Sequence, residues 1–534
     1  MLCPLYIIDP EYPFAQTHEM NVGPVRANFV LESLRDLDNS LAGLGSKLFV
    51  MRGDPRKVLP TVISSLRKCE VGGNDDVHIN LVYEKECAAP IREMDTEILG
   101  AVRKLKIPEL NIESFDTHSL FEMEHYLAKC KNGVAPGTMT AFRKVFNSMG
   151  DVPAEVETVT KCAKAPDLSS LLPTNQLPSL SFVNESSSSC NGRLLGVPHL
   201  ENLGYDRGSC DIVRKDGDCK FVGGEKEAMK LLNQMKQRKR WVAEFEKPKT
   251  KPNALVPDTT GLSAYVKHGC LSARVFYHAL SDIYELFPKH TQPPVSLHGQ
   301  LLWREFNYLT GYSTPNFDKM VNNPIARQIP WDDDPQLLAA WRDARTGYPF
   351  IDAIMTQLKE TGWIHHLARH AAACFLTRGD LWQSWERGAE VFEERLIDAD
   401  WSINNYNWQW LSCTAHFYQY FRCYSPVAFG KKTDPNGDYI RKWLPQFKKF
   451  PKKYIYEPWN APLSVQQGCG VVIGTDYPAP IVDHKSISKG NMGRMKEAYN
   501  AHKTSQTGNA AMGTSRQKSL DSSEKATAKR RRRN

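Results

Sequence analysis

Two short stretches decide the architecture of this chain: GWIHHLARH at residues 362–370 and DADWSIN at residues 398–404. The second stretch places carboxylates and an amide within one or two helical turns. Arg369 in the first stretch is the obvious counter-charge for one of these carboxylates. A buried ion pair costs several kcal/mol of desolvation and is a weak device for stability alone. If this segment is buried, we therefore expect a polar ligand beside it. The alternative, an exposed acidic helix start, is disfavoured because Trp401, Trp408 and Trp410 surround it.

The first stretch also carries a pair of histidines. His366 and His370 are four residues apart, so they lie on one face of a helix. The spacing HxxxH occurs in metal sites, but the general-base Glu of HExxH is absent and Arg369 would repel a cation. We therefore predict no metal. Two interpretations stay open. The histidines could lie in a helical core with their ring nitrogens hydrogen-bonded, or they could form an acid/base pair beside a ligand.

The region around these stretches, from Gly223 to about residue 500, is helical and aromatic in character and holds every tryptophan of the chain. Aromatic side chains fill cores well, so a large helical core accounts for some of them. Near its start, the turn TTGLS at 259–263 precedes a helical run. Backbone amides and hydroxyls at a helix start can bind phosphate, although Ser and Thr also serve as ordinary caps.

The first 130 residues follow another pattern. Short apolar runs at residues 5–8, 48–51 and 78–83 alternate with stretches of helical periodicity. Strands that alternate with such helices predict an α/β domain with a parallel sheet over residues 1–130.

The alternation of apolar runs and helical periodicity ends over residues 131–215, which contain several prolines and a run of serines at 186–189. This composition predicts a long linker, mostly on the surface. A helical domain would follow over residues 216–500, and a disordered basic tail over residues 501–534. The tail ends in KRRRR at 529–533, which indicates nuclear import or nucleic-acid binding, or else a solvated tail of no function.

Composition excludes several classes of protein. The 534 residues carry a net charge of +8, with 41% hydrophobic and 24% charged residues, which fits a globular protein and excludes wholesale disorder. We expect no membrane span, because no apolar run of about 18 residues occurs. The first residues lack the layout of a secretory signal. The 13 cysteines contain no CxxC pair, which favours free thiols in a reducing compartment. The basic tail makes the nucleus the expected location.

Eight motifs together resemble the photolyase/cryptochrome family, in the branch of (6-4) photolyases and animal-type cryptochromes. They are LSAYVKHGCLS, HGQLLWREF, NPIARQIPW, RTGYPFIDA, GWIHHLARH, LTRGDLW, DADWSINNYNW and DPNGDYIRKWLP. The resemblance runs from residue 1 to about 500. It implies an α/β N-terminal domain and a large all-α C-terminal domain that binds FAD without a covalent link. The chain begins at what resembles the strand after the family's opening motif, so we expect the first strand of the sheet to be missing.

The resemblance carries a flavin site onto this chain. Arg369 and Asp398 would form the ion pair beside the ring system, and Asp400 would accept from its polar edge. Asn404 would face flavin N5, where insect-type cryptochromes commonly carry Cys. An asparagine at this position therefore favours the photolyase interpretation. The implied cofactor-binding residues are Thr260, Gly261, Leu262, Ser263, Gln300, His366, Arg369, Asp398, Ala399, Asp400 and Asn404.

The resemblance also implies a chain of tryptophans that reduces the photoexcited flavin. It would run from Trp408 through Trp385 to Trp331, with Trp382 as an outer fourth member. Because Trp382 and Trp385 are three residues apart, we expect them to be neighbours on one helix face. Core packing is the alternative for each of these residues.

For damaged DNA, the resemblance implies His366 and His370 as catalytic residues. The lesion would be bound by Lys247, Gln300, Trp303, Trp410 and Tyr424. Photolyases are among the enzymes that flip a target base out of the stack, and aromatic side chains would receive it. The basic residues between 431 and 453, interleaved with aromatics, would contact phosphates or form a merely solvated surface.

The leading hypothesis is therefore light-driven repair of (6-4) pyrimidine photoproducts by electron transfer from excited reduced FAD, the reaction of a (6-4) DNA photolyase. The alternative is a blue-light photoreceptor or transcriptional regulator, and one protein could do both. The partners would be UV-damaged DNA in the first case and clock or transcription-factor proteins in the second. We expect a monomer.

Departures from the family pattern accompany these expectations. Ala264 and His268 stand where Pro and Phe are usual, and Asn405-Tyr406 replaces a small Ala-Gly pair. We expect the bulky Tyr406 to lie beside the flavin and to alter its access or chemistry. The missing opening segment leaves open whether a second, antenna chromophore, a deazaflavin or a folate, binds as well.

Overall fold

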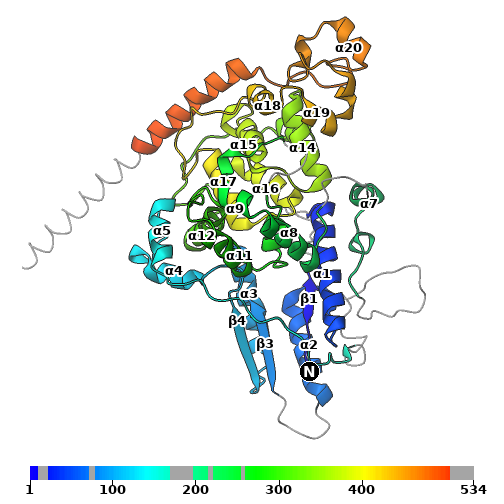
Figure 1. Cartoon of the computed structure of the whole chain (residues 1–534), viewed down its shortest axis with the longest axis vertical. Coiled ribbons are helices and arrows are strands. Elements are labelled where there is room, and N and C mark those ends of the chain that lie inside the picture. The colour runs from blue at the N-terminus through cyan, green and yellow to red at the C-terminus, as the bar shows by residue number, and fades with distance from the viewer. Residues whose placement is uncertain (10–21, 71–77, 169–195, 215–220, 254–258, 505–534) are drawn as a thin grey trace, which may run out of the picture.

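The strands of this protein gather at one end of the molecule, and a large body of helices forms the rest (Figure 1). This arrangement confirms the predicted α/β N-terminal region and the largely helical C-terminal region. The computed structural model describes residues 1–9, 22–70, 78–168, 196–214, 221–253 and 259–504.

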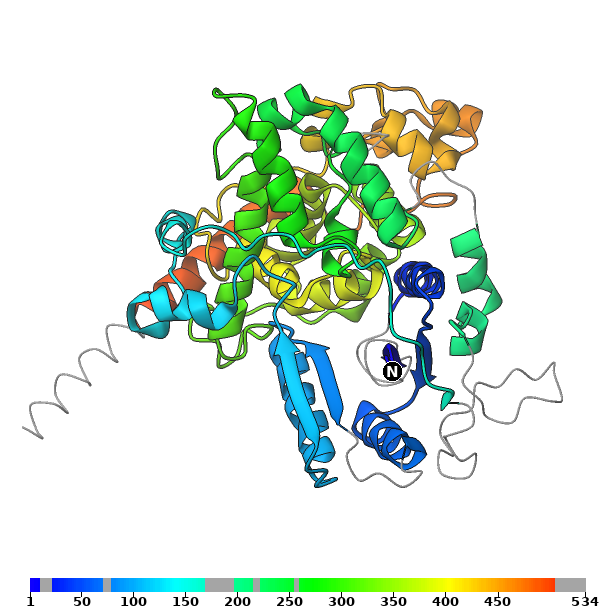
Figure 2. The same ribbon diagram turned by 60° about the horizontal axis from the view of Figure 1, so that its bottom comes forward.

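Parallel strand pairs form the N-terminal region. β1 (Leu5–Ile8) pairs with β2 (Phe49–Arg52), and β3 (Ile79–Glu84) pairs with β4 (Leu110–Phe115). The described strands make two separate pairs, visible in Figure 2. Parallel strands need crossover connections. The crossover from β1 to β2 contains α1 (Pro24–Gly43), and that from β3 to β4 contains α3 (Ala89–Arg103), while α2 (Pro55–Glu70) follows β2 and precedes the second pair.

β1, β2 and β3 confirm the three predicted apolar runs to within one residue, whereas the sequence analysis missed β4. The difference lies in composition, because β3 has the same alternation of partly buried and exposed residues as β4 and was still predicted. Phe49, Val50 and Met51 of β2 are all buried, which gives a continuous apolar run. In β4 partly buried residues alternate with exposed ones, and its last residue, Phe115, is 50% exposed. Polar residues interrupt the apolar positions of β4 (LNIESF), whereas β3 (INLVYE) contains the unbroken run Leu81–Tyr83, so β4 leaves a weaker pattern in the sequence.

The predicted linker starts too early. α4 (Met123–Lys129) is followed by α5 (Met139–Asn147), which lies inside the stretch assigned to the linker. Phe142 and Phe146 of α5 are buried, and Phe142 stacks on Phe306 of the helical body with ring centroids 5.3 Å apart. α5 is short, so its few apolar positions did not stand out. Residues 148–167 have no regular secondary structure, and the serine run lies outside the described residues.

Helices make up most of the remaining chain. Their bounds are α7 (Arg207–Arg214), α8 (Glu225–Gln237), α9 (Lys239–Glu244), α10 (Ser263–Lys267), α11 (Ala273–Glu285), α12 (Leu297–Ser313), α13 (Pro335–Arg342), α14 (Pro349–Thr361), α15 (His366–Cys374), α16 (Trp385–Arg395), α17 (Trp401–Leu411), α18 (Ala428–Thr433), α19 (Asp438–Trp443) and α20 (Leu463–Cys469). α17 packs against both α12 and α16 and also contacts α15. The central position of α17 brings the two deciding stretches of the sequence together.

A further helix over residues 484–504 runs along the outside of the helical body, in orange in Figure 1. Its Met495, Ala498 and Tyr499 pack against a cluster that contains Trp382. The helix continues past residue 501, where the tail was predicted to begin, and the rest of that tail lies outside the described residues. Within the described ranges, none of the helices combines the length and the apolar character that a membrane span requires.

Candidate functional site

Segments far apart in the chain meet at one ion pair. Nη2 of Arg369, on α15, lies 2.8 Å from Oδ2 of Asp398, as the sequence predicted. The hydroxyl of Ser263 donates to the same oxygen at 2.7 Å, which adds the TTGLS turn to this meeting point. Gly261 within that turn has a φ of +68°, in the left-handed region that favours glycine. The Asp398 side chain is only 6% exposed.

The second oxygen of Asp398, Oδ1, is buried and finds no hydrogen-bond partner in the part of the chain that the structure describes. A buried carboxylate oxygen without a donor is costly. A ligand with N–H or O–H donors would satisfy it, so the residues at this site fit a polar cofactor such as FAD.

His268, which stands where the family usually has Phe, supports the same ion pair. Burial lowers the pKa of His268 to about 3, so the ring is neutral. Its Nε2 donates to the carbonyl oxygen of Ile397 at 2.8 Å. The departure therefore adds a hydrogen bond that Phe could not make, and it fixes the backbone immediately before Asp398.

Asp400 caps the helix that follows it. Its Oδ1 accepts from the backbone N–H of Ile403 at 3.0 Å, which starts α17. Its Oδ2 accepts from the hydroxyl of Tyr308 at 2.5 Å, and that hydroxyl lies 2.8 Å from Nε2 of His118. Burial holds the pKa of His118 well below its ordinary value, so this link to the N-terminal region is uncharged. Both oxygens of Asp400 are thus engaged, and its contact with the flavin edge stays a prediction.

The amides of the predicted site are oriented by the backbone. Nδ2 of Asn404 donates to the carbonyl oxygen of Ala389 on α16 at 3.0 Å, which leaves Oδ1 as the acceptor. Gln300 donates to the carbonyl oxygens of Pro294 and Ser296 at 3.3 Å each. Ala399 is buried. An amide oxygen kept for an N–H donor suits the role predicted for Asn404.

The predicted histidines lie at the start of α15. The rings of His366 and His370 are 5.9 Å apart and nearly perpendicular, at 83°. Nδ1 of His370 lies 3.2 Å from the hydroxyl of Tyr424. His365 accepts from the N–H of Leu367 and caps the helix. The four-residue spacing therefore places His366 and His370 side by side, as predicted.

Burial and neighbouring cations keep these imidazoles neutral. Burial lowers the pKa of His370 to about 3 and that of His366 further, and the charge of Lys247 adds to both shifts. The pKa of Lys247 is itself lowered to about 8, by burial and by Arg369. Burial disfavours charge of either sign, but the positive charges of Lys247 and Arg369 favour an incoming negative charge, which would raise the pKa values of the imidazoles.

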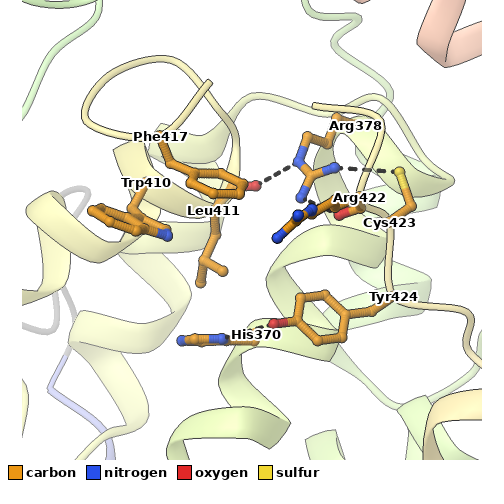
Figure 3. A pocket seen from close by; sticks show the side chains of 8 residues that line it. All are labelled: His370, Arg378, Trp410, Leu411, Phe417, Arg422, Cys423 and Tyr424. Carbon is orange, nitrogen blue, oxygen red and sulfur yellow. Dashed lines mark hydrogen bonds between the residues drawn. The ribbon is translucent and has the colours of Figure 1, made fainter. Parts of the chain in front are cut away.

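His370, Trp410 and Tyr424 line a pocket of about 350 Å³ (Figure 3). The pair formed by His370 and Tyr424 lies on one side of this pocket, and the rings of Trp410 and Phe417 lie on another. Those two rings stack with centroids 5.3 Å apart and planes at 15°. The pocket lining does not include His366, Lys247, Gln300 or Trp303, although Trp303 makes an edge contact with Trp410 at 6.1 Å.

Arg378 is a pocket residue that the sequence analysis missed. Its buried guanidinium donates to the carbonyl oxygens of Leu411, Tyr420 and Arg422, at 2.8, 2.7 and 2.9 Å. These contacts hold the loop over residues 412–427, which supplies half of the pocket wall. Arg378 lies in the motif LTRGDLW, so the motif contained it, but its role depends on a loop that lies more than thirty residues away in sequence.

Tyr406 replaces a small residue of the family and packs among rings of this chain. It stacks on His416 at 3.9 Å and contacts Phe306 at 5.7 Å and Trp410 at 6.2 Å. The Tyr406 side chain is buried. The structure therefore places Tyr406 as a packing partner of Trp410, and the predicted effect on flavin access stays untested.

The inner tryptophans of the predicted electron path are fully buried. Trp408 lies against α16 at Gly388, where an added Cβ would come within 2.2 Å of its ring. Trp385 is on the same face of α16, three residues before Gly388. Trp408 also contacts Trp341 at 6.1 Å, a tryptophan that the sequence analysis did not place near the path.

The expectation that Trp382 and Trp385 share a helix face is wrong. α16 begins at Trp385, and Trp382 lies before it in a turn, with a φ of +54°. Trp382 instead contacts Trp331, with ring centroids 4.8 Å apart. Three-residue spacing implies neighbours only inside a helix, and the helix break over residues 380–384 was not visible in the sequence.

No group of three or more His, Cys, Asp or Glu side chains that could hold a metal ion occurs in the described ranges.

Comparison with known proteins gives the family. Family models match the chain over residues 1–159, described as DNA photolyase, and over residues 296–497, described as FAD binding domain of DNA photolyase. The chain is 46% identical to (6-4)DNA photolyase of Arabidopsis thaliana over 511 residues, which cover 94% of this chain and 84% of the relative. It is 44% identical to Cryptochrome-1 of Gallus gallus over 499 residues, which cover 93% of this chain and 73% of the relative.

A solved structure has the same fold. The cryptochrome of Synechocystis sp. PCC6803 superposes with a TM-score of 0.72 at 24% identity, over 92% of each chain. At that identity the similarity supports the fold alone, while the matches above include both photolyases and cryptochromes. The chain belongs to the photolyase/cryptochrome family and carries the FAD-binding domain of that family.

Proposed function

We propose that this protein repairs (6-4) pyrimidine photoproducts in DNA with the energy of light. The observation that carries the proposal is the neutral pair of His366 and His370 on one face of α15. It lies near Lys247 and the ion pair of Arg369 with Asp398, and His370 reaches into an aromatic-walled pocket.

The pocket suits a flipped base. Trp410 and Phe417 offer ring surfaces on which a base can stack, and Tyr424 holds His370 on another side. Tyr424 also packs against Phe429 of α18, at 4.8 Å. α18 carries the exposed Lys431 and Lys432, so a cationic surface for the DNA backbone adjoins the pocket.

Reduced FAD, when bound and excited by light, supplies the electron for this chemistry. Negative charge on the lesion would lie near Lys247 and Arg369, and it would raise the pKa of the nearby imidazoles. With its pKa raised, His366 would take up a proton from solvent, and this imidazolium would donate the proton to the lesion. The transferred OH or NH group would return before the electron goes back. His370, held by Tyr424, would orient His366. General acid catalysis of this kind is typically worth about 10²–10⁴-fold.

The tryptophan path prepares the protein for this reaction. Trp408, Trp385 and Trp331 would pass an electron inward, one step at a time, to reduce the cofactor under light. Trp385 and Trp408 are buried and Trp331 is half-buried, so the path leads from the core toward solvent.

A blue-light receptor is the second candidate, because the chain is as similar to Cryptochrome-1 of Gallus gallus as to the plant photolyases. In that case the histidines would line the cofactor pocket and respond to its redox state, and the partners would be clock or transcription-factor proteins.

Repair of a defined lesion separates the candidates. Purified protein is incubated with an oligonucleotide that carries one (6-4) photoproduct, with and without blue light, and with undamaged and cyclobutane-dimer oligonucleotides as controls. Restoration of the (6-4) site in the light alone supports repair. If a preparation binds FAD and is reduced by light but does not restore the (6-4) site, the result supports the receptor function.

We also propose that the basic residues 529–533 direct the protein to the nucleus. A fluorescent reporter fused to residues 525–534 should accumulate there, and the same fusion with these five residues replaced by alanine should not. A cytoplasmic wild-type fusion would exclude this role.

A further inference from the structure

The turn that follows α17 is strained and carries part of the pocket wall. Cys413 and His416 have φ values of +60° and +63°, in the left-handed region that residues other than glycine rarely adopt. The next residue, Phe417, lines the pocket and stacks on Trp410 with ring centroids 5.3 Å apart. Strained backbone persists only where the surrounding structure holds it. The contacts of this turn therefore determine whether Trp410 and Phe417 stay parallel.

Hydrogen bonds to backbone groups hold the first part of the turn. The N–H groups of Thr414 and Ala415 donate to the carbonyl oxygen of Gln409 at 3.0 and 3.2 Å. The hydroxyl of Tyr499 donates to the carbonyl oxygen of Cys413 at 2.7 Å. None of these bonds involves His416, so the ring of His416 must be held by contacts of its own.

Packing holds the ring of His416. The ring stacks on Tyr406 with centroids 3.9 Å apart and planes at 18°, and it lies farther from Phe317, at 6.4 Å. Burial lowers the pKa of His416 to about 4, so the ring is neutral, and its buried Nε2 has no hydrogen-bond partner among the described residues. The stack with Tyr406 is therefore the contact that fixes this ring.

Tyr406 connects His416 to the pocket wall. Its ring also lies against Trp410, with centroids 6.2 Å apart and planes at 28°. Tyr406 and Trp410 are four residues apart on α17, so they share one face of this helix. The buried Tyr406 ring thus contacts both the strained turn and the wall. The small residue that the family has at this position would make neither contact.

We propose that Tyr406 is a positioning residue of the pocket, which holds His416 and thereby keeps Trp410 and Phe417 parallel for a flipped base. This inference rests on the proposed function for the nature of the ligand, a base of damaged DNA, whereas the stack itself belongs to this chain alone. A wall that is ordered beforehand need not be ordered when the ligand binds, which strengthens binding. Tyr406 therefore acts on the affinity for the lesion and not on proton donation by His366.

Hydrogen exchange of the turn tests this role without DNA. The full chain, loaded with FAD, is placed in deuterated water, and mass spectrometry follows exchange in peptides that contain residues 412–417. Tyr406→Leu keeps an apolar side chain but removes the stack, so exchange of the Thr414 and Ala415 amides should become about two- to tenfold faster, the factor that an aromatic pair is worth in an equilibrium constant. Tyr406→Phe, which keeps the ring, should exchange like wild type. Wild-type exchange in Tyr406→Leu overturns the proposal.

Two substitutions of His416 give the decisive comparison. Asparagine tolerates a positive φ but has no ring, whereas phenylalanine has a ring and tolerates a positive φ poorly. If the stack holds the turn, His416→Phe stays near wild type and His416→Asn exchanges about two- to tenfold faster. The opposite order would mean that the backbone preference of residue 416 alone fixes the turn, and it would overturn the proposal. His416 is half-buried, so His416→Asn carries the comparison even if Tyr406→Leu fails to fold.

Repair kinetics then connect the turn to the lesion. On an oligonucleotide that carries a (6-4) photoproduct, Tyr406→Leu should raise KM by about two- to tenfold and leave kcat near the wild-type value, because His366 and the cofactor site are unchanged. An unchanged KM in a variant whose turn exchanges faster would overturn the role of Tyr406 in the pocket. If wild-type protein does not repair this lesion at all, the proposed function fails, while the exchange rates still decide whether Tyr406 holds the turn.

Discussion

α15 and α17 are in contact, yet the side chains around them differ in kind. We call His366, His370, Lys247 and Arg369 the histidine side, and Trp408, Trp385, Trp382 and Trp331 the tryptophan side. On the histidine side burial has shifted the pKa values of the imidazoles and of Lys247. On the tryptophan side Trp385 and Trp408 lie in an apolar core, and Nε1 of Trp385 has no partner within the described ranges.

The contrast shows how one helical body can support both proton transfer and electron transfer. Moving a proton requires titratable groups whose pKa values respond to an arriving charge. Passing an electron between rings requires close packing and does not require hydrogen bonds at each indole. A substitution on the histidine side should therefore affect proton transfer alone, and one on the tryptophan side should affect electron transfer alone.

His366→Asn should give the largest effect. Loss of the acid group should lower (6-4) repair by about 10²–10⁴-fold, while FAD binding and light-driven reduction stay as in wild type. Repair is measured on the damaged oligonucleotide under blue light. The matched control is His125→Asn, because the side chain of His125 is 66% exposed and lies on α4, outside the site. Wild-type repair by His366→Asn would mean that another group donates the proton.

Trp408→Phe should produce the opposite phenotype. Rapid reduction of the cofactor under blue light should be nearly lost, whereas protein reduced chemically beforehand should repair normally. The control is Trp341→Phe, because Trp341 is equally buried and contacts Trp408 but lies off the predicted path. Unchanged photoreduction in Trp408→Phe would remove this residue from the path. Loss in both variants would point to packing around Trp408 as the cause.

Arg378→Met should affect the histidine side through its pocket. The variant leaves buried carbonyl oxygens of the loop over residues 412–427 without a charged donor, and each such hydrogen bond is worth about 1.5–3 kcal/mol. We expect the free energy of unfolding to fall by roughly 3 kcal/mol, and repair to fall more than photoreduction. Arg387→Met, which removes an exposed pair with Glu390, should cost no more than about 1 kcal/mol. Equal losses in both variants would show that the loop does not depend on Arg378.

The sequence predicted best what is local or carried by a motif. Helical spacing correctly placed His366 and His370 together. Charge complementarity assigned Arg369 to one of the carboxylates of the second stretch, and the family resemblance identified that carboxylate as Asp398. Apolar runs located β1, β2 and β3. In each case the interaction follows from residues close in sequence, or from a buried charge that needs an opposite one.

Features that depend on distant backbone could not be predicted. Arg378 organises a loop through carbonyl groups, which leave no mark on side-chain patterns. Trp382 lies in a turn with positive φ, so its three-residue spacing to Trp385 gave the wrong neighbour. The stacking of Tyr406 on His416 was not predicted either, because His416 lies ten residues further along the chain, across a turn.

The smallest expected effect tests a titrating contact on the tryptophan side. Nδ1 of His484, at the start of the helix over residues 484–504, lies 2.7 Å from Oδ1 of the buried Asp380, two residues before Trp382. The hydrogen bond to Asp380 raises the pKa of His484, against the effect of burial. Burial in turn raises the pKa of Asp380, which His484 partly offsets.

A folded-state pKa above the ordinary histidine value of about 6.5 means that the contact stabilises the fold fully below that pH. The stabilisation is then lost as the pH rises through the raised pKa. The melting temperature of wild type should exceed that of His484→Gln by the largest margin near pH 6, corresponding to about 1 kcal/mol, and the margin should shrink toward pH 9. A margin that is constant with pH would mean that His484 acts by packing alone. A margin that grows toward pH 9 would mean that neutral His484 is the better partner of this loop, and that the tryptophan side carries no titrating contact at this position.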